Sequence, residues 1–274
     1  MPTEILGANL GHQRAAGAAS GVSLSTTAAF TAFHRGTEYI DLIPRNFSGA
    51  AVARYALCPY LVILKADSAD DLAGPIADYS AIAQDGSTAT TVDLSSFAAG
   101  RNVYVGSAIP FRGVNIDVNT TNSTGSTALT VYYWAGSWVD ISDSDGTSSS
   151  VSLDQDGSVT WTVPSAWQST SLVKIDRSVN SSLSWRDVQM YWTKWTWSHA
   201  MDSTVTLYHM LGINESTAYA EVPSSLGTGM RIHNGFGSNG VAGVETLTNA
   251  GTGNMLVTCS ALNGYFSTGK LTTV

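Results

Sequence analysis

Apolar and polar residues alternate with a period of two in many short segments of the chain. Clear examples are residues 114–118, 129–133, 159–163 and 188–192. Such alternation gives a strand one buried face and one wet face. Glycine, asparagine, aspartate or serine bounds each segment, and these residues mark turns. Strands repeated at this spacing predict an all-β fold, an antiparallel β-sandwich or jelly-roll-like domain.

Two flanking regions differ from this pattern. Residues 5–33 are rich in Ala, Gly, Ser and Thr, carry almost no charge and show no clear periodicity. We expect residues 1–36 to form an extended N-terminal arm, either disordered or held against a neighbouring subunit, and residues 37–211 to form the sandwich. After residue 212 tryptophan disappears and Gly and Asn become frequent. This change predicts a small C-terminal β module over 212–274, or extra strands of the sandwich, with strands near 230–233, 241–247, 255–259 and 265–267.

Local signals predict several turns. Ala135-Gly136 separates two strong strand segments, and glycine tolerates the positive φ that a tight hairpin requires. Asp145-Gly146 and Asp156-Gly157 are signals of the same kind. The acidic segment 67–72 is where the sequence predicts a helical turn.

The composition agrees with a β protein. The chain has 35 Ser, 30 Thr and 26 Gly, and only 12% of its residues are charged. Thr, Val, Tyr and Trp favour strands, whereas Lys and Glu, which are scarce here, favour helix surfaces. These frequencies disfavour a helical bundle and a doubly wound α/β enzyme.

Charge and hydropathy disfavour two classes of partner. The net charge is −8, and a phosphate-binding surface needs clustered Lys and Arg, so we expect no nucleic-acid partner. No apolar run reaches the length of a membrane span, so we expect no membrane partner. The N-terminus has no basic segment followed by an apolar one, so we expect no signal peptide. Without export, we expect Cys58 and Cys259 to be free buried thiols, with a disulfide as the alternative.

No complete reactive constellation stands out in the sequence. Nucleophile-elbow and P-loop motifs are missing, and no carboxylate pair is singled out for glycosidase chemistry. Aspartates crowd residues 140–156, where DSDG and DQDG resemble fragments of a calcium loop, but the order of an EF-hand fails. We therefore expect no enzyme, cofactor or metal ion, with a calcium site as the alternative. No zinc-type spacing includes any of the five histidines, His12, His34, His199, His209 and His233.

The tryptophans are the most informative residues. All eight lie between Trp134 and Trp197, and residues 191–197 read YWTKWTW. In a strand, Trp195 and Trp197 share one face and Trp192 lies on the other. Aromatic side chains on both faces cannot all enter a single core, so we expect some to be exposed or at an interface. The candidates for an interface or for stacking on glycans are Trp138, Trp192, Trp195 and Trp197.

Residues 102–198 carry glycine, proline and aromatic residues in a distinctive order. In chain order these residues are Val105, Gly106, Ser107, Pro110, Phe111, Tyr133, Trp134, Gly136, Trp138, Asp145, Gly146, Thr147, Gly157, Val159, Trp161, Pro164, Trp167, Tyr191 and Trp192. In this order and spacing, the segment resembles a β module of structural proteins of tailed bacteriophages. Two departures from that module are Ala135, where asparagine is usual, and Lys194 with Trp195, where an arginine region is usual. The arm and the C-terminal module show no such resemblance.

The resemblance implies a non-enzymatic virion structural protein with a β-sandwich. Negative charge and a Ser/Thr-rich, Lys-poor surface fit the outside of the particle. We therefore expect a capsid decoration or cement protein on the outer capsid surface, assembled in the host cytoplasm. Its expected partners are the major capsid protein and copies of itself, as in a trimer. The alternative is a carbohydrate-binding module of a tail or head fibre, with exposed tryptophans that stack on surface glycans.

Overall fold

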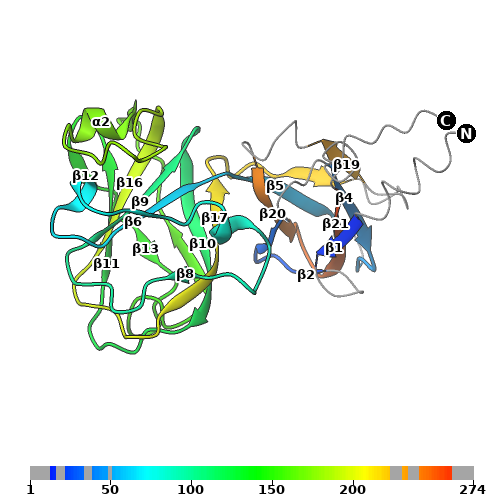
Figure 1. Ribbon diagram of the computed structural model, residues 1–274. Helices are drawn as coiled ribbons and strands as arrows, with labels where there is room; N and C mark the ends of the chain where they lie inside the picture. Colours follow the sequence, from blue (N-terminus) through cyan, green and yellow to red (C-terminus); the bar gives the residue numbers. More distant parts are fainter. Residues whose placement is uncertain are drawn as a thin grey trace, which may run out of the picture. The chain divides into compact units, whose positions relative to one another are not determined.

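The computed structural model describes residues 13–16, 22–33, 39–48, 51–222, 230–233 and 241–260. Its regular structure is nearly all β, which confirms the predicted all-β sandwich class. The chain divides into two compact units. The central unit is Pro59–Thr217, and the split unit combines Met1–Cys58 with Ala218–Val274 (Figure 1).

The central unit is built from two antiparallel sheets. The large sheet has the order β12-β11-β16-β9-β6-β7, with β15 also paired to β16, and the small sheet has the order β13-β14-β10-β17-β8. The large sheet contains β6 (Val62–Ala66), β7 (Ala77–Asp78), β9 (Asn102–Ser107), β11 (Leu129–Trp134), β12 (Trp138–Asp140), β15 (Ser169–Thr170) and β16 (Met190–Trp197). The small sheet contains β8 (Val92–Asp93), β10 (Phe111–Thr120), β13 (Ser144–Asp145), β14 (Gly157–Thr160) and β17 (Thr206–Asn214).

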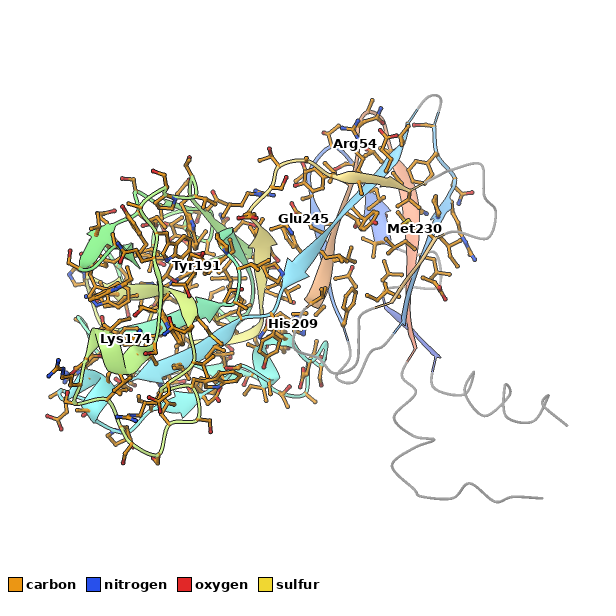
Figure 2. The ribbon with its side chains drawn as sticks, turned by 90° about the horizontal axis from the view of Figure 1, so that it is seen from above. Arg54, Lys174, Tyr191, His209, Met230 and Glu245 are labelled. Atoms are coloured by element: carbon orange, nitrogen blue, oxygen red, sulfur yellow. The ribbon has the colours of Figure 1, made fainter. Side chains whose placement is uncertain are left out.

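An inner core fills the space between these two sheets. The large sheet contributes alternate residues such as Val103 and Val105 of β9. The small sheet contributes Val114 and Ile116 of β10, while the intervening Asn115 is only partly buried. The period of two in this segment therefore has the predicted cause, a strand with one face in the core. Figure 2 shows the side chains that fill this unit.

A second, outer core covers the opposite face of the large sheet. Val62 and Leu64 of β6 lie there beside Tyr104 of β9, while a short helix contributes Leu172 and a loop contributes Val179. The helical pieces of the unit are short: η1 (Asp71–Ala73), η2 (Ile82–Gln84) and α2 (Leu172–Ile175). The sequence predicted only the first of these. Because both faces are covered, β6 begins with a continuous apolar run, Val62–Leu64, rather than an alternating pattern.

The split unit is a smaller sandwich. One sheet has the order β1-β21-β4-β19 with β2 also on β21, and the other has the order β18-β5-β20-β3. Ile40, Leu42, Val244, Met255 and Val257 are among the buried residues of its core. The strands are β1 (Gln13–Ala16), β2 (Val22–Leu24), β3 (Ala29–Ala32), β4 (Tyr39–Arg45), β5 (Ala53–Pro59), β18 (Ala220–Val222), β19 (Met230–His233), β20 (Val241–Thr248) and β21 (Gly253–Ser260).

This division differs from the expected one of 1–36, 37–211 and 212–274. Strands β1 and β2 pair with β21, and β3 pairs with β20, so the described parts of the expected arm belong to a sheet of their own chain. The predicted strands near 230–233, 241–247 and 255–259 are present as β19, β20 and β21. The predicted strand at 265–267 lies outside the described residues, as does the side chain of Cys259, whereas Cys58 is buried.

The central unit is an insertion between β5 and β18 of the split unit. The point where the chain enters this unit lies beside its last strand, β17. A Cβ on Gly212 of β17 would lie 2.8 Å from the carbonyl oxygen of Pro59. Close ends are the usual property of a domain inserted into another.

One predicted hairpin turn is confirmed, and two others are not formed as predicted. Trp134 pairs with Trp138 across the β11–β12 hairpin, and Gly136 has a φ of +92°, as the sequence predicted. Gly146 and Gly157 do not form two hairpins. They stand at the two ends of one loop between β13 and β14, so close that a Cβ on Gly157 would lie 2.1 Å from the carbonyl oxygen of Gly146. Loop residues 151–153 are buried without forming a strand.

Candidate functional site

The tryptophans of β16 are buried on both faces of the large sheet. Trp195 and Trp197 enter the inner core and are 0% and 3% exposed, whereas Trp192 enters the outer core and is 0% exposed. The predicted division between the two faces is therefore confirmed. The expectation that some of these aromatic side chains are exposed or at an interface was wrong for Trp192, Trp195 and Trp197, because the fold has two cores. None of these three indoles can stack on a glycan in this fold.

Buried indole N–H groups have acceptors within the protein. Trp192 Nε1 donates to the carbonyl oxygen of Thr170 at 3.0 Å, and Trp195 Nε1 donates to Thr193 Oγ1 at 2.9 Å. Trp197 Nε1 donates to Ser152 Oγ at 3.0 Å. An unpaired buried donor is costly, so these bonds fix the orientation of each ring. The run is thus a structural element of the two cores.

A further group of aromatic rings joins the large and small sheets. Phe111 at the start of β10 lies 5.4 Å from Trp161 and 5.2 Å from Trp167, measured between ring centroids. Trp161 in turn makes an edge contact with Trp195 at 6.2 Å. Trp161 Nε1 donates to the carbonyl oxygen of Phe111 at 2.8 Å. Residues that carry the bacteriophage resemblance therefore meet inside the inner core, where they determine packing.

One group of aromatic side chains reaches the surface. Trp138 of β12 is half-buried. Its ring centroid lies 5.3 Å from that of Trp134, and the angle between the two ring planes is 75°. The ammonium of Lys194 lies 5.4 Å from the Trp138 ring centroid and 4.9 Å from that of Tyr132. We call Tyr132, Trp134, Trp138 and Lys194 the aromatic–lysine patch. Of the four tryptophans predicted as site residues, only Trp138 belongs to it.

The register of three strands assembles this patch. Tyr132 of β11 lies opposite Lys194 of β16, and Trp134 lies opposite Trp138 of β12. Residues opposite each other on paired strands share a face, here the face that also carries the outer core. Tyr132, Trp134 and Lys194 were not among the predicted site residues. The alternation in LTVYYW and YWTKWTW indicates which residues of each strand share a face. It does not show which residues of the two strands lie opposite each other, and the patch depends on that register.

Burial and one carboxylate control the electrostatics beside the patch. Burial lowers the pKa of Lys194 below its ordinary value, and the negative charge of Asp71 partly offsets this effect. Tyr104 Oη donates to Asp71 Oδ2 at 2.7 Å, and burial together with this bond raises the pKa of Tyr104. Lys194 is thus a half-buried cation held over two rings, in a geometry typical of a cation–π contact.

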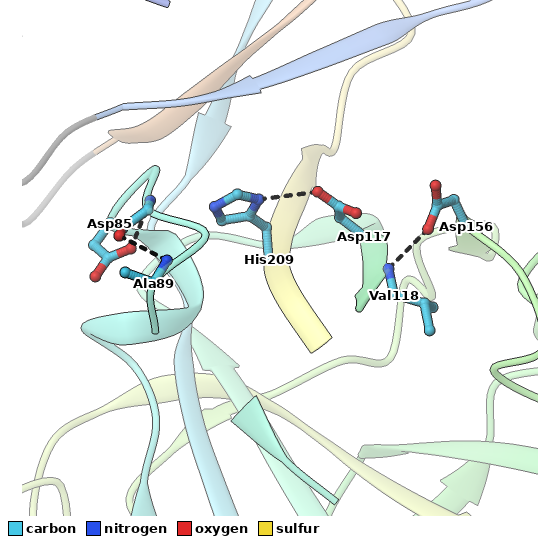
Figure 3. A network of polar contacts seen from close by, with 7 residues as sticks. Asp85, Ala89, Asp117, Val118, Asp156 and His209 are labelled. Atoms are coloured by element: carbon cyan, nitrogen blue, oxygen red, sulfur yellow. Dashed lines mark hydrogen bonds and ion pairs between the residues drawn. The ribbon is translucent and has the colours of Figure 1, made fainter. Parts of the chain in front are cut away.

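His209 lies beside a carboxylate. It lies opposite Asp117 on the paired strands β17 and β10, and its Nδ1 lies 3.2 Å from Asp117 Oδ2 (Figure 3). Asp156 Oδ1 accepts a hydrogen bond from the backbone N–H of the adjacent Val118 at 2.8 Å. These bonds tie strands and loops together. Within the described part of the chain, no nucleophile is hydrogen-bonded to His209.

The aspartates of residues 140–156 stabilise their own loops. Asp154 accepts hydrogen bonds from the backbone N–H groups of Ser149, Ser150 and Val151 and from two serine hydroxyls. These bonds, led by the one from Ser149 N–H, lower the pKa of Asp154. Asp145 accepts from the N–H and hydroxyl of Thr147 in the same way. Among the residues that the structure describes, no group of three His, Cys, Asp or Glu side chains is placed to hold a metal ion.

Comparisons with protein-family models, with curated proteins and with solved structures gave no match for this chain. Over the described ranges, no helix is long and apolar enough to cross a membrane.

Proposed function

We propose that this chain is a non-enzymatic structural protein of a tailed-bacteriophage virion, and that it decorates the outer surface of the capsid. One observation carries the proposal. Several residues of the bacteriophage resemblance, among them Gly106, Trp161, Trp167 and Trp192, pack into the two cores of the central unit. Residues that two proteins share because of a common catalytic activity would line a pocket with titratable groups. Shared residues that pack in a core instead indicate a common structural module.

The physical character of the chain fits an outer position. A net charge of −8 disfavours contact with packaged DNA, because phosphate neutralisation needs clustered cations. The buried indoles of the central unit have hydrogen-bond acceptors, as expected of a well-packed β-sandwich. An arm reaching to a neighbouring subunit is no part of this proposal, because the described strands β1, β2 and β3 pair within the chain.

The alternative role, glycan binding through exposed tryptophans, has less support. Trp192, Trp195 and Trp197 are buried, and the planes of Trp134 and Trp138 are 75° apart. A sugar-binding platform presents open ring faces, whereas Trp138 has Lys194 over its ring and Tyr104 at 5.8 Å. The geometry therefore favours the structural role.

A comparison of particle stability tests the proposal. A decoration protein that binds only the assembled shell stabilises that state by mass action. Particles made without this chain should release their DNA at a lower temperature than complete particles, and added purified chain should restore the higher temperature. Equal release temperatures, or no binding of the added chain, would contradict the proposed function.

A further inference from the structure

The aromatic–lysine patch contains a cation that has no hydrogen-bond acceptor among the described residues. Within the described residues, Lys194 Nζ makes no hydrogen bond and has no carboxylate within 4.0 Å. Its contacts are the rings of Tyr132 and Trp138. Desolvating a cation is unfavourable unless a partner compensates it, and the rings supply only part of that compensation.

Aromatic side chains next to this cation are open to a partner. Trp134 is half-buried and belongs to neither core of the central unit, and its only ring contact in the described structure is with Trp138. Tryptophan and tyrosine contribute much of the binding energy at protein interfaces, because they bury a large area at a small entropic cost. A cation beside such rings selects a partner that carries negative charge.

We propose that the aromatic–lysine patch is the surface through which this chain docks on an acidic protein segment of the assembled shell. One carboxylate of that segment would accept hydrogen bonds from Lys194 Nζ, and its apolar neighbours would cover Trp134 and the edge of Trp138. This inference rests on the proposed function and adds the chemistry of the contact. A protein segment fits better than a sugar, because side chains can cover two perpendicular rings whereas a flat sugar face covers one.

Asp71 limits the charge that the partner can carry. Its negative charge acts on Lys194, but its Oδ2 is occupied by the hydroxyl of Tyr104 at 2.7 Å. The positive charge of Lys194 can therefore compensate one carboxylate of the partner. The negative charge of Asp71 would repel a partner with a dense cluster of acidic residues. This balance predicts a moderate dependence of binding on salt.

Binding of purified full-length chain to particles made without it tests the proposal. Lys194→Met keeps the aliphatic stem between the rings and removes the charge, and Trp134→Ser removes a ring outside both cores. Lys174→Met is the matched control, because Lys174 is exposed on α2 and the net charge changes equally (Figure 2). We expect a loss of affinity of about 30-fold for Lys194→Met and for Trp134→Ser, and less than about 2-fold for Lys174→Met. Urea midpoints equal to that of the wild type establish that each variant is folded.

The possible outcomes separate the two proposals. If the wild-type chain does not bind the particles, the proposed function fails, and this inference fails with it. If the wild-type chain binds and all three variants bind equally well, only the docking surface is wrong. If a soluble acidic oligosaccharide releases the bound wild-type chain while an acidic peptide does not, the patch is a sugar site and a protein partner is excluded.

Discussion

Gly106 lies directly beneath the indole ring of Trp192. The two residues are paired across β9 and β16, and a Cβ on Gly106 would lie 2.6 Å from both Cε3 and Cζ3 of the ring. Trp192 is 0% exposed, and its Nε1 is bound to the carbonyl oxygen of Thr170, so the ring has no free direction in which to move. Glycine at position 106 is therefore a steric requirement of the outer core.

We predict that Gly106→Ala destabilises the protein by about 1–3 kcal/mol, the usual cost of overpacking a filled core. Gly125→Ala is the control, because a Cβ there meets nothing within 4 Å, and it should change stability by less than about 0.5 kcal/mol. Urea denaturation of both variants measures the difference. Equal midpoints for the two alanine variants would show that the ring is free to shift.

Thr193 supports a second tryptophan through a buried hydroxyl. It accepts from Trp195 Nε1 and donates to the carbonyl oxygen of Val105 at 3.0 Å. Thr193→Val keeps the shape but leaves a buried indole N–H and a carbonyl without their partner, which should cost about 1–3 kcal/mol. Thr162→Val, at an exposed position, is the matched control. A thermal unfolding midpoint for Thr193→Val as high as that of Thr162→Val would refute the role of the hydroxyl.

Acid should destabilise the fold partly through Asp154. Hydrogen bonds, the largest from Ser149 N–H, hold its folded pKa below the unfolded value of about 3.9. A depressed carboxyl pKa stabilises the fold above the unfolded pKa, and this contribution disappears as the pH falls through the folded pKa. Asp154→Asn should therefore lower the urea midpoint at pH 7 and reduce the fall in midpoint below pH 4. The contribution is small because the carboxylate is near solvent.

The opposite shift at Asp143 does not affect this comparison. Burial raises the pKa of Asp143, so that residue opposes stability as the pH rises. Its effect is present in both proteins and cancels when Asp154→Asn is compared with the wild type across the same pH range. Parallel pH profiles for the two proteins would contradict the role assigned to Asp154.

The central unit should fold without the rest of the chain. The buried residues of its inner and outer cores all come from Pro59–Thr217, and its entry and exit lie together at Pro59 and Gly212. We predict that residues 59–217 expressed alone unfold cooperatively in urea, with the tryptophan fluorescence of the full-length protein. A gradual transition with solvent-exposed tryptophan emission would contradict this independence.

The alternation of apolar and polar residues predicted the strands that have one buried and one more exposed face. Residues 114–118 and 129–133 alternate because one side of β10 and of β11 faces the inner core. The same rule placed Trp195 and Trp192 on opposite faces. It could not predict that both are buried, because the layer over Trp192 comes from the one-turn helix that holds Leu172 and from the loop that holds Val179, and these segments are too short to show a periodicity.

Long-range pairing was also invisible in the sequence. Ala29 of β3 pairs with Thr246 of β20, and Val22 of β2 pairs with Met255 of β21. These strands have three or four residues and take their stability from partners more than two hundred positions away, so their own sequence shows no strand signal. The aromatic–lysine patch was missed for a related reason, since it depends on the register between β11, β12 and β16.

Immunogold labelling of intact particles with antibody to this chain tests the central claim most directly. A decoration protein on the outer capsid predicts gold spread over the faceted head, with none on particles made without the chain. Gold confined to the tail or its fibres, or none on intact particles that contain the chain, would contradict a decorating role on the capsid.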